Sequence, residues 1–198
     1  MSKIAIDVVL LPPDEIMDFI IDINKNEEKQ GNSKGALNKV NFLPHLSLAM
    51  GVIKKADFDK VTKIIATISE QFEEMNLEIG EPYFVTGEDE IKSYGLKVLG
   101  KHLQNFHEEL MNQLGPFLTF DATREEIYKQ EEDPDYVNTY KEKGSFENYE
   151  PHITLRCKEV TSEIPKIKFK VNRIVMCHIG KSTTCRKILF ETELRKIN

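Results

Sequence analysis

The sequence predicts an α+β fold of one domain with two lobes, and three observations support this prediction. The chain has 198 residues, which is enough for one domain with a sizeable core. Strand-like and helix-like apolar patterns follow one another along the chain. One eight-residue phrase also occurs twice, as NFLPHLSL at 41–48 and as NYEPHITL at 148–155. We therefore treat residues 1–198 as a single domain with one phrase in each lobe.

The first part of the chain is predicted as two strand–helix pairs. Residues 3–12 are apolar and β-branched and are closed by two prolines, as expected of a strand. A helix follows over 14–26, with acidic residues in its first turn and apolar residues at helical spacing. A second strand is predicted at 45–53, and a long helix at 57–75 carries its apolar residues on one stripe.

The rest of the chain is predicted to add further strands, one helix and a charged insertion. The predicted elements are strands near 76–80, 82–87 and 93–99, a helix at 101–115, and strands at 152–157, 166–180 and 185–194. The helix ends at a glycine, and the short KSTT segment predicts a hairpin between the last two strands. Residues 123–147 are highly charged, so we expect an exposed insertion with some helix.

Composition and charge narrow the class of partner. With 40% hydrophobic and 30% charged residues, the chain has the composition of an ordinary globular protein. A net charge of −6 disfavours a protein that grips long nucleic acid by its backbone and favours short or small phosphorylated ligands. No stretch approaches the roughly 20 apolar residues of a membrane span, so no membrane partner is expected.

The cysteines and the N-terminus indicate a cytoplasmic location. The chain begins without the basic and apolar pattern of a signal peptide. Its three cysteines, Cys157, Cys177 and Cys185, are odd in number and have no CxxC spacing. We expect free thiols in a reducing compartment, and no zinc site built from them.

Each copy of the repeated phrase presents an imidazole and a hydroxyl together. Side chains alternate between the two faces of a strand, so His45 and Ser47 point the same way, as do His152 and Thr154. The aliphatic residues between and after them face the core. A proline before each histidine disfavours helix at the preceding residue.

Two such faces across a cleft supply what cleavage of a phosphodiester requires. One imidazole can take a proton from the attacking water or hydroxyl while the other gives a proton to the leaving oxygen. The two hydroxyls can donate hydrogen bonds to the non-bridging oxygens of phosphorus, where negative charge builds up. This chemistry needs no metal and no cofactor, so the sequence predicts a phosphodiester-cleaving site.

The two tetrapeptides HLSL and HITL, each at the start of a strand in its own half of the chain, resemble the signature of the 2H phosphoesterase superfamily. This superfamily includes 2′-5′ RNA ligase-like proteins and cyclic nucleotide phosphodiesterases. The N-terminal IDVVLLPPDEI and the helical LQNFHEEL also resemble family segments. The resemblance implies two antiparallel sheets that frame a central cleft, with helices on the outer faces.

The resemblance also implies substrates and residue roles. It implies metal-independent action on ribose 2′-linked phosphodiesters, such as 2′,3′-cyclic phosphates, 2′-5′ oligonucleotides or short RNA. His45 and His152 correspond to the acid–base pair, and Ser47 and Thr154 to the phosphate-binding hydroxyls. Arg156 is a further phosphate-binding candidate, although the family arginine commonly stands one position later. We expect a monomer, although the sequence does not determine the oligomeric state.

The aromatic residue three positions before each histidine, Phe42 or Tyr149, has two interpretations. Either ring can stack on a base, or it can pack the preceding loop onto its lobe. Lys158, Lys181 and Arg186 are candidates for a positive rim, although lysines at strand edges often serve only solubility.

Three other hypotheses remain open at this stage. The same cleft can belong to a non-catalytic nucleotide- or RNA-binding module, or to a 2′-5′ RNA ligase or RNA-end-processing enzyme. A metal site built on the two histidines lacks carboxylate or thiolate partners at suitable spacing. The remaining histidines, His102, His107 and His178, lie outside both phrases and are expected to be structural.

Overall fold

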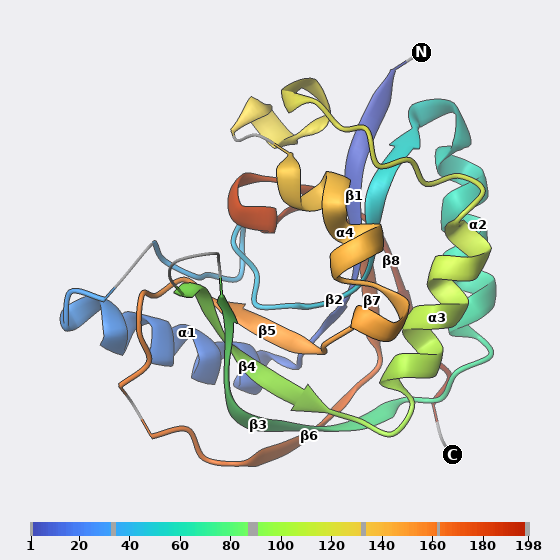
Figure 1. Cartoon of the computed structure of the whole chain (residues 1–198). Helices are drawn as coiled ribbons and strands as arrows, with labels where there is room; N and C mark the ends of the chain where they lie inside the picture. The colour runs from blue at the N-terminus through green and yellow to red at the C-terminus, as the bar shows by residue number, and fades with distance from the viewer. Residues whose placement is uncertain (1, 33–34, 87–90, 132–133, 162, 197–198) are drawn as a thin grey trace.

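The computed structural model contains a single antiparallel sheet and four α-helices, and it describes residues 2–32, 35–86, 91–131, 134–161 and 163–196 (Figure 1). The strands are β1 (Lys3–Leu11), β2 (Leu46–Lys54), β3 (Met75–Thr86), β4 (Ile91–Leu99), β5 (His152–Leu155), β6 (Ile167–Val171), β7 (Arg173–Ile179) and β8 (Cys185–Glu193). The helices are α1 (Asp14–Lys29), α2 (Phe58–Ser69), α3 (Leu103–Leu114) and α4 (Asp135–Lys143). The predicted α+β class is therefore confirmed.

The sheet consists of two four-stranded halves that meet at the strands of the repeated phrases. The strand order is β6-β3-β4-β5-β2-β1-β7-β8, and all neighbours are antiparallel. The two predicted sheets are thus the halves of one sheet, joined where β5 pairs with β2. The only registered pair at this junction in the described chain is Leu46 with Ile153.

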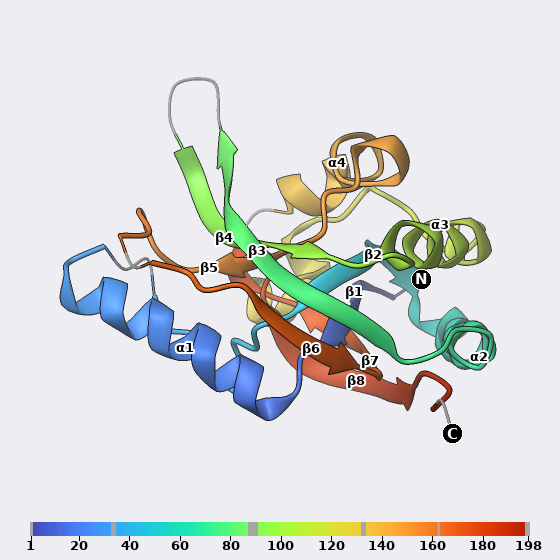
Figure 2. The same cartoon turned by 90° about the horizontal axis from the view of Figure 1, so that it is seen from below.

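The segment 166–180 differs from its prediction as a single strand. It forms β6 and β7, which pair with β3 and β1 in opposite halves of the sheet. Only Asn172 separates the two strands. Because so short a connection cannot cross a flat sheet, the sheet must curl until β6 lies near β7, as Figure 2 shows.

The helices form where apolar residues recur at helical spacing, and their buried faces share one core with the sheet. In α1 the buried residues include Ile16, Ile20 and Ile23, and two acidic residues in the first turn complement the helix dipole. α2 and α3 pack against each other, and α3 also packs on β2. In Figure 2 they lie together on one side of the sheet and α1 lies on the other side of the molecule.

The charged segment 123–147 contributes to the core as well as to the surface. Its charged side chains are mostly exposed, but Ile127, Val137 and Tyr140 are buried. α4 packs against β2. Asn138 also makes two hydrogen bonds with the backbone of Ala122. The segment is therefore held against the half of the sheet that contains β2.

The cysteines differ from their prediction. Cys177 and Cys185 form a disulfide between neighbouring strands β7 and β8, and Cys157 is buried and does not take part in it. The expectation of three free thiols is wrong because the hairpin brings these two side chains together, with a Cα–Cα distance of 5.4 Å. Among the described residues, no helix is long and apolar enough to cross a membrane.

Candidate active site

The two phrases lie side by side at the junction of the sheet halves. Leu46 on β2 is paired with Ile153 on β5, and these two side chains are 1% and 0% exposed. Because neighbouring residues on a strand point to opposite faces, the residues on either side of this pair lie on the other face. The structure thus brings together all four motif side chains, which are half-buried: His45, Ser47, His152 and Thr154.

Both motif histidines are held by the same backbone hydrogen bond. His45 Nδ1 lies 2.7 Å from the carbonyl oxygen of Leu43, and His152 Nδ1 lies 2.7 Å from that of Glu150. A carbonyl oxygen only accepts, so Nδ1–H donates in each case and the neutral ring carries its lone pair on Nε2. Each imidazole therefore has one nitrogen fixed by the backbone and the other able to exchange a proton with a substrate.

The surroundings lower the pKa of both imidazoles, and the causes differ in part between the two. Burial lowers the pKa of His45, the Leu43 carbonyl partly offsets this, and the nearby His152 lowers it further. Burial also lowers the pKa of His152, whereas the backbone and carboxylate of Glu150 raise it. The two rings are thus close enough to interact electrostatically, and the Glu150 carboxylate favours the protonated form of His152.

His152 is further positioned by one residue of β3 and one of β4. The ring of Tyr83 on β3 stacks on its imidazole, with centroids 4.3 Å apart, and the Tyr83 hydroxyl donates to Glu150 Oε2 at 2.7 Å. Gly95 on β4 allows close approach, because a Cβ there would stand 2.8 Å from the carbonyl oxygen of Ile153. His152 therefore lies against the ring of Tyr83 and near the backbone of Gly95.

Asp7 is a site residue that the sequence analysis missed. It lies on β1 with no exposed surface, and Ser47 Oγ donates to its Oδ2 at 2.6 Å. The same Oδ2 is 3.8 Å from His45 Nε2. Burial raises the pKa of Asp7 well above its usual value, and the Ser47 hydrogen bond offsets this only in part. An acid inside the apolar run KIAIDVVLL was the available signal.

Tyr149 lies in a buried position that agrees with the interpretation of a ring that packs its loop onto the lobe. Its side chain is buried, and its ring stacks on the imidazole of His107 with centroids 3.9 Å apart. Its hydroxyl donates to the backbone oxygen of Ser47 at 3.0 Å. The ring therefore fixes the backbone of the first motif.

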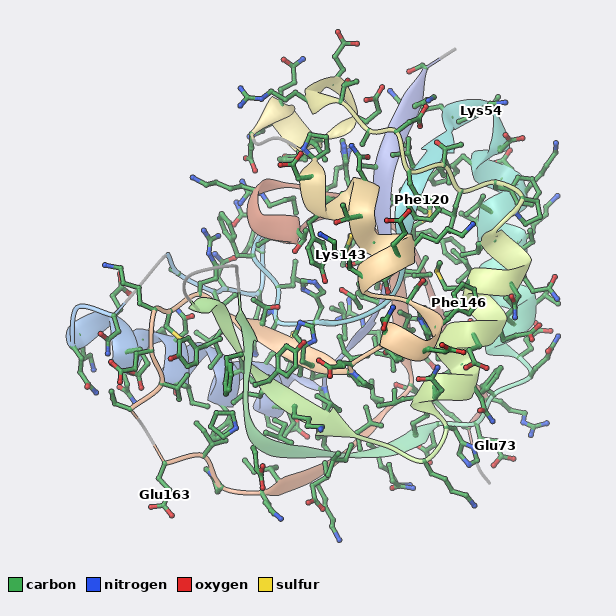
Figure 3. All side chains as sticks on the ribbon, viewed as in Figure 1. Lys54, Glu73, Phe120, Lys143, Phe146 and Glu163 are labelled. Carbon is green, nitrogen blue, oxygen red and sulfur yellow. A yellow bond between two sulfur atoms is a disulfide. The ribbon has the colours of Figure 1, made fainter. Side chains whose placement is uncertain are left out.

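His107 completes this support, as a buried structural residue on α3. Its Nδ1 is hydrogen-bonded to the carbonyl oxygen of Leu48 at 2.5 Å. Its Nε2 accepts from the backbone N–H of Phe146 at 2.7 Å. Phe146, labelled in Figure 3, lies between α4 and α3. The imidazole therefore connects three segments behind the first motif.

Phe42 and Arg156, both candidate site residues, lie together. The Arg156 guanidinium lies over the Phe42 ring, with Cζ 4.4 Å from its centroid, and Arg186 lies over the same ring at 3.8 Å. Two guanidinium groups therefore lie over the Phe42 ring. In the described part of the chain, no group of three or more His, Cys, Asp or Glu side chains is arranged to hold a metal ion.

Comparison with known proteins reveals a similarity of structure. No protein-family model and no curated protein sequence matches this chain. The structure of TT0787 from Thermus thermophilus is similar with a TM-score of 0.64 and 12% identity, over 98% of this chain and 100% of that one. E. coli LigT with bound NADP+ is similar with a TM-score of 0.59 and 14% identity, over 98% and 99%.

A further solved structure, described as a phosphoesterase, is 12% identical with a TM-score of 0.56, over 98% of this chain and 99% of that one. At such identities the similarity concerns the fold. The predicted resemblance is therefore confirmed at this level, and the chain has the fold shared by LigT, TT0787 and this phosphoesterase.

Proposed function

We propose that the protein is a 2H-type phosphoesterase that cleaves ribose 2′-linked phosphodiesters without a metal ion. The observation that carries the proposal is the paired arrangement of His45 and His152 on adjacent strands, each with Nδ1 bound to a backbone carbonyl. Two imidazoles that differ only in their surroundings are suited to act as base and acid in one reaction. The fold shared with a phosphoesterase and with LigT supports the same reaction class.

The proposed mechanism assigns one role to each imidazole. His45 Nε2 accepts the proton of the attacking water as the new P–O bond forms. His152, whose protonated form is favoured by Glu150, gives its proton to the leaving ribose oxygen as the P–O bond breaks. The Ser47 and Thr154 hydroxyls lie on the same face and are suited to bind the non-bridging oxygens. Attack by the adjacent ribose hydroxyl instead of water would use the same two imidazoles.

Short nucleotides are the proposed substrates. E. coli LigT has been solved with 3′-AMP and with ATP, which supports a nucleotide ligand for this fold. The net charge of −6 also suits a small substrate better than a long nucleic acid. Within this class we propose 2′,3′-cyclic nucleotides and 2′-5′ oligonucleotides, acted on by a monomer.

A substrate panel in excess chelator tests this function. We expect turnover of 2′,3′-cyclic nucleotides or 2′-5′ dinucleotides and no turnover of the matched 3′-5′ dinucleotides. Chromatography of the products distinguishes 2′-phosphates from 3′-phosphates. Tight binding without turnover across the panel would instead indicate a binding module, and joining of cyclic-phosphate and 5′-hydroxyl ends would indicate a ligase.

The pH dependence of kcat/KM gives a second prediction. The free enzyme must hold the base histidine neutral and the acid histidine protonated, so kcat/KM should follow a bell-shaped curve. Because the surroundings lower both histidine pKa values below 6.5, we expect the maximum on the acidic side of pH 6.5. A descending limb that begins only above about pH 8 would contradict the assignment of a buried histidine as the acid.

A further inference from the structure

A cluster of two arginines and one phenylalanine lies beside the motif histidines. Arg186 and Arg156 place their Cζ atoms 3.8 and 4.4 Å from the centroid of the Phe42 ring. Phe42 belongs to the first repeated phrase, and Arg156 directly follows the second. We call these three residues the arginine cluster. It brings two positive charges together near the start of the first phrase and the end of the second. The net charge of the whole protein is negative.

Arg186 is a buried cation with unused hydrogen-bond donors. Its side chain is only 9% exposed, and its Nη2 pairs with Glu131 Oε1 at 2.6 Å. Within the described part of the chain, Arg186 Nε and Nη1 are buried and have no hydrogen-bond partner. Burying donors of a charged group without partners is costly. The planar guanidinium has the geometry that binds phosphate oxygens in pairs.

The surroundings hold Arg186 in place. Its stem lies against Gly180, where an added Cβ would stand 2.8 Å from Arg186 Cδ and 2.8 Å from Glu131 Oε2. The backbone N–H of Lys181 donates to the same Glu131 oxygen at 3.0 Å. Glu131 therefore binds one edge of the guanidinium and is itself fixed. The remaining donors belong to a preorganised group and not to a mobile surface side chain.

The backbone connects Arg186 directly to the first motif. Leu43 forms a β-bridge with Cys185, the residue before Arg186. The carbonyl oxygen of the same Leu43 accepts the hydrogen bond from His45 Nδ1. Arg186 therefore directly follows the residue whose backbone pairs with the segment that holds His45.

We propose that the arginine cluster is a subsite for a second phosphate of the substrate, with Arg186 as its main ligand. The substrate class is then a nucleotide or short oligonucleotide that carries a further phosphate, such as a 5′-phosphate, beside the phosphodiester that is cleaved. The identity of that first phosphate rests on the proposed function. The second phosphate rests on the unpartnered, buried donors of Arg186.

Binding measurements with two nucleotides test this subsite independently of turnover. The probes are 3′-AMP and adenosine 3′,5′-bisphosphate, which differ only in the 5′-phosphate, and the readout is calorimetry on the protein with its disulfide intact. We expect the bisphosphate to bind at least about tenfold more tightly to the wild type, as charge-assisted hydrogen bonds allow. In Arg186→Gln this preference should fall to within about twofold.

A matched control separates the subsite from general charge effects. Lys187→Gln removes one positive charge from the next residue of β8, which is exposed, and should keep the preference for the bisphosphate. Glu131→Gln removes the carboxylate that shares the guanidinium and should increase the preference. This second variant also keeps the test decisive if Arg186→Gln fails to fold.

The outcomes distinguish the subsite from the proposed function. Equal affinity of the wild type for the two probes, or an unchanged preference in Arg186→Gln, would overturn the subsite even if the diester panel shows turnover. A preference that depends on Arg186 would uphold the subsite even if no diester is cleaved, and the proposed function alone would then fail.

Discussion

Replacing either His45 or His152 with alanine is expected to lower kcat on the preferred phosphodiester by about 10²–10⁴-fold. Each substitution removes one partner of the acid–base pair while the other imidazole keeps its backbone hydrogen bond. Steady-state kinetics at the pH optimum of the wild type would measure the effect. The double variant is expected to lose little more than either single variant, because acid and base act in one step.

His102→Ala is the matched control for both variants. His102 is exposed, stands at the N-terminal end of α3 and belongs to neither phrase. Its loss is expected to leave kcat unchanged, and circular dichroism should show that all variants stay folded. Wild-type rates in either His45→Ala or His152→Ala would refute the paired mechanism.

Replacing Asp7 with asparagine is expected to raise the free energy of unfolding at pH 8 by about 1–3 kcal/mol, because the neutral amide removes the cost of burying an ionisable carboxylate. Asp7 is fully buried, and its Oδ1 has no hydrogen-bond partner among the described residues. An asparagine has nearly the same shape and no charge, and its amide can donate to Ser47 Oγ. Activity should therefore change far less than in the histidine variants.

The stabilisation by Asp7→Asn should depend on pH in a defined direction. Burial raises the pKa of Asp7 above 3.8 in the folded protein, so the folded state keeps a proton that the unfolded chain releases. The stability linked to this proton is complete below pH 3.8 and is lost as pH rises through the raised pKa. The advantage of the asparagine variant should therefore shrink from about pH 8 toward about pH 4.

Urea unfolding at several pH values measures this effect, and Asp22→Asn serves as its control. Asp22 is exposed on α1 and forms a surface ion pair with Lys25, so its substitution should change stability by less than about 0.5 kcal/mol. If Asp7→Asn lowers the free energy of unfolding by the same amount at every pH, burial does not disfavour the ionised carboxylate of Asp7.

The neutral form of Asp7 also bears on the proposed role of Ser47. When Asp7 is ionised, the Ser47 hydroxyl donates across the 2.6 Å contact and its proton is occupied. When Asp7 is protonated, the carboxyl can donate instead, which releases the Ser47 proton for a phosphate oxygen. A raised pKa of Asp7 thus favours the state in which Ser47 can bind an anion.

The parts of this site that the sequence predicted are those that depend on local alternation. His45 and Ser47 share a face, as do His152 and Thr154, because a strand places every second residue on one side. The juxtaposition of the two strands followed from the repetition of the phrase. The first inference needs only the alternation of side chains along a strand. The second also assumes that the two halves of the chain are related by an approximate two-fold axis.

The parts that were missed depend on contacts between distant segments. The stacking of Tyr149 on His107 and the burial of Asp7 arise only when α3 and α4 pack on β2, the neighbour of β1. The single strand predicted at 166–180 splits at Asn172 because its halves pair with different strands. No local pattern determines which strand becomes a neighbour of which.

The join between the two halves of the sheet has a mechanical consequence. The two imidazoles belong to different halves and meet where Leu46 faces Ile153, with no loop between them to absorb movement. Any shear or twist of one half against the other is therefore transmitted directly to the separation of the two Nε2 atoms. The stiffness of the junction between β2 and β5 therefore determines how constant the separation of the two Nε2 atoms remains.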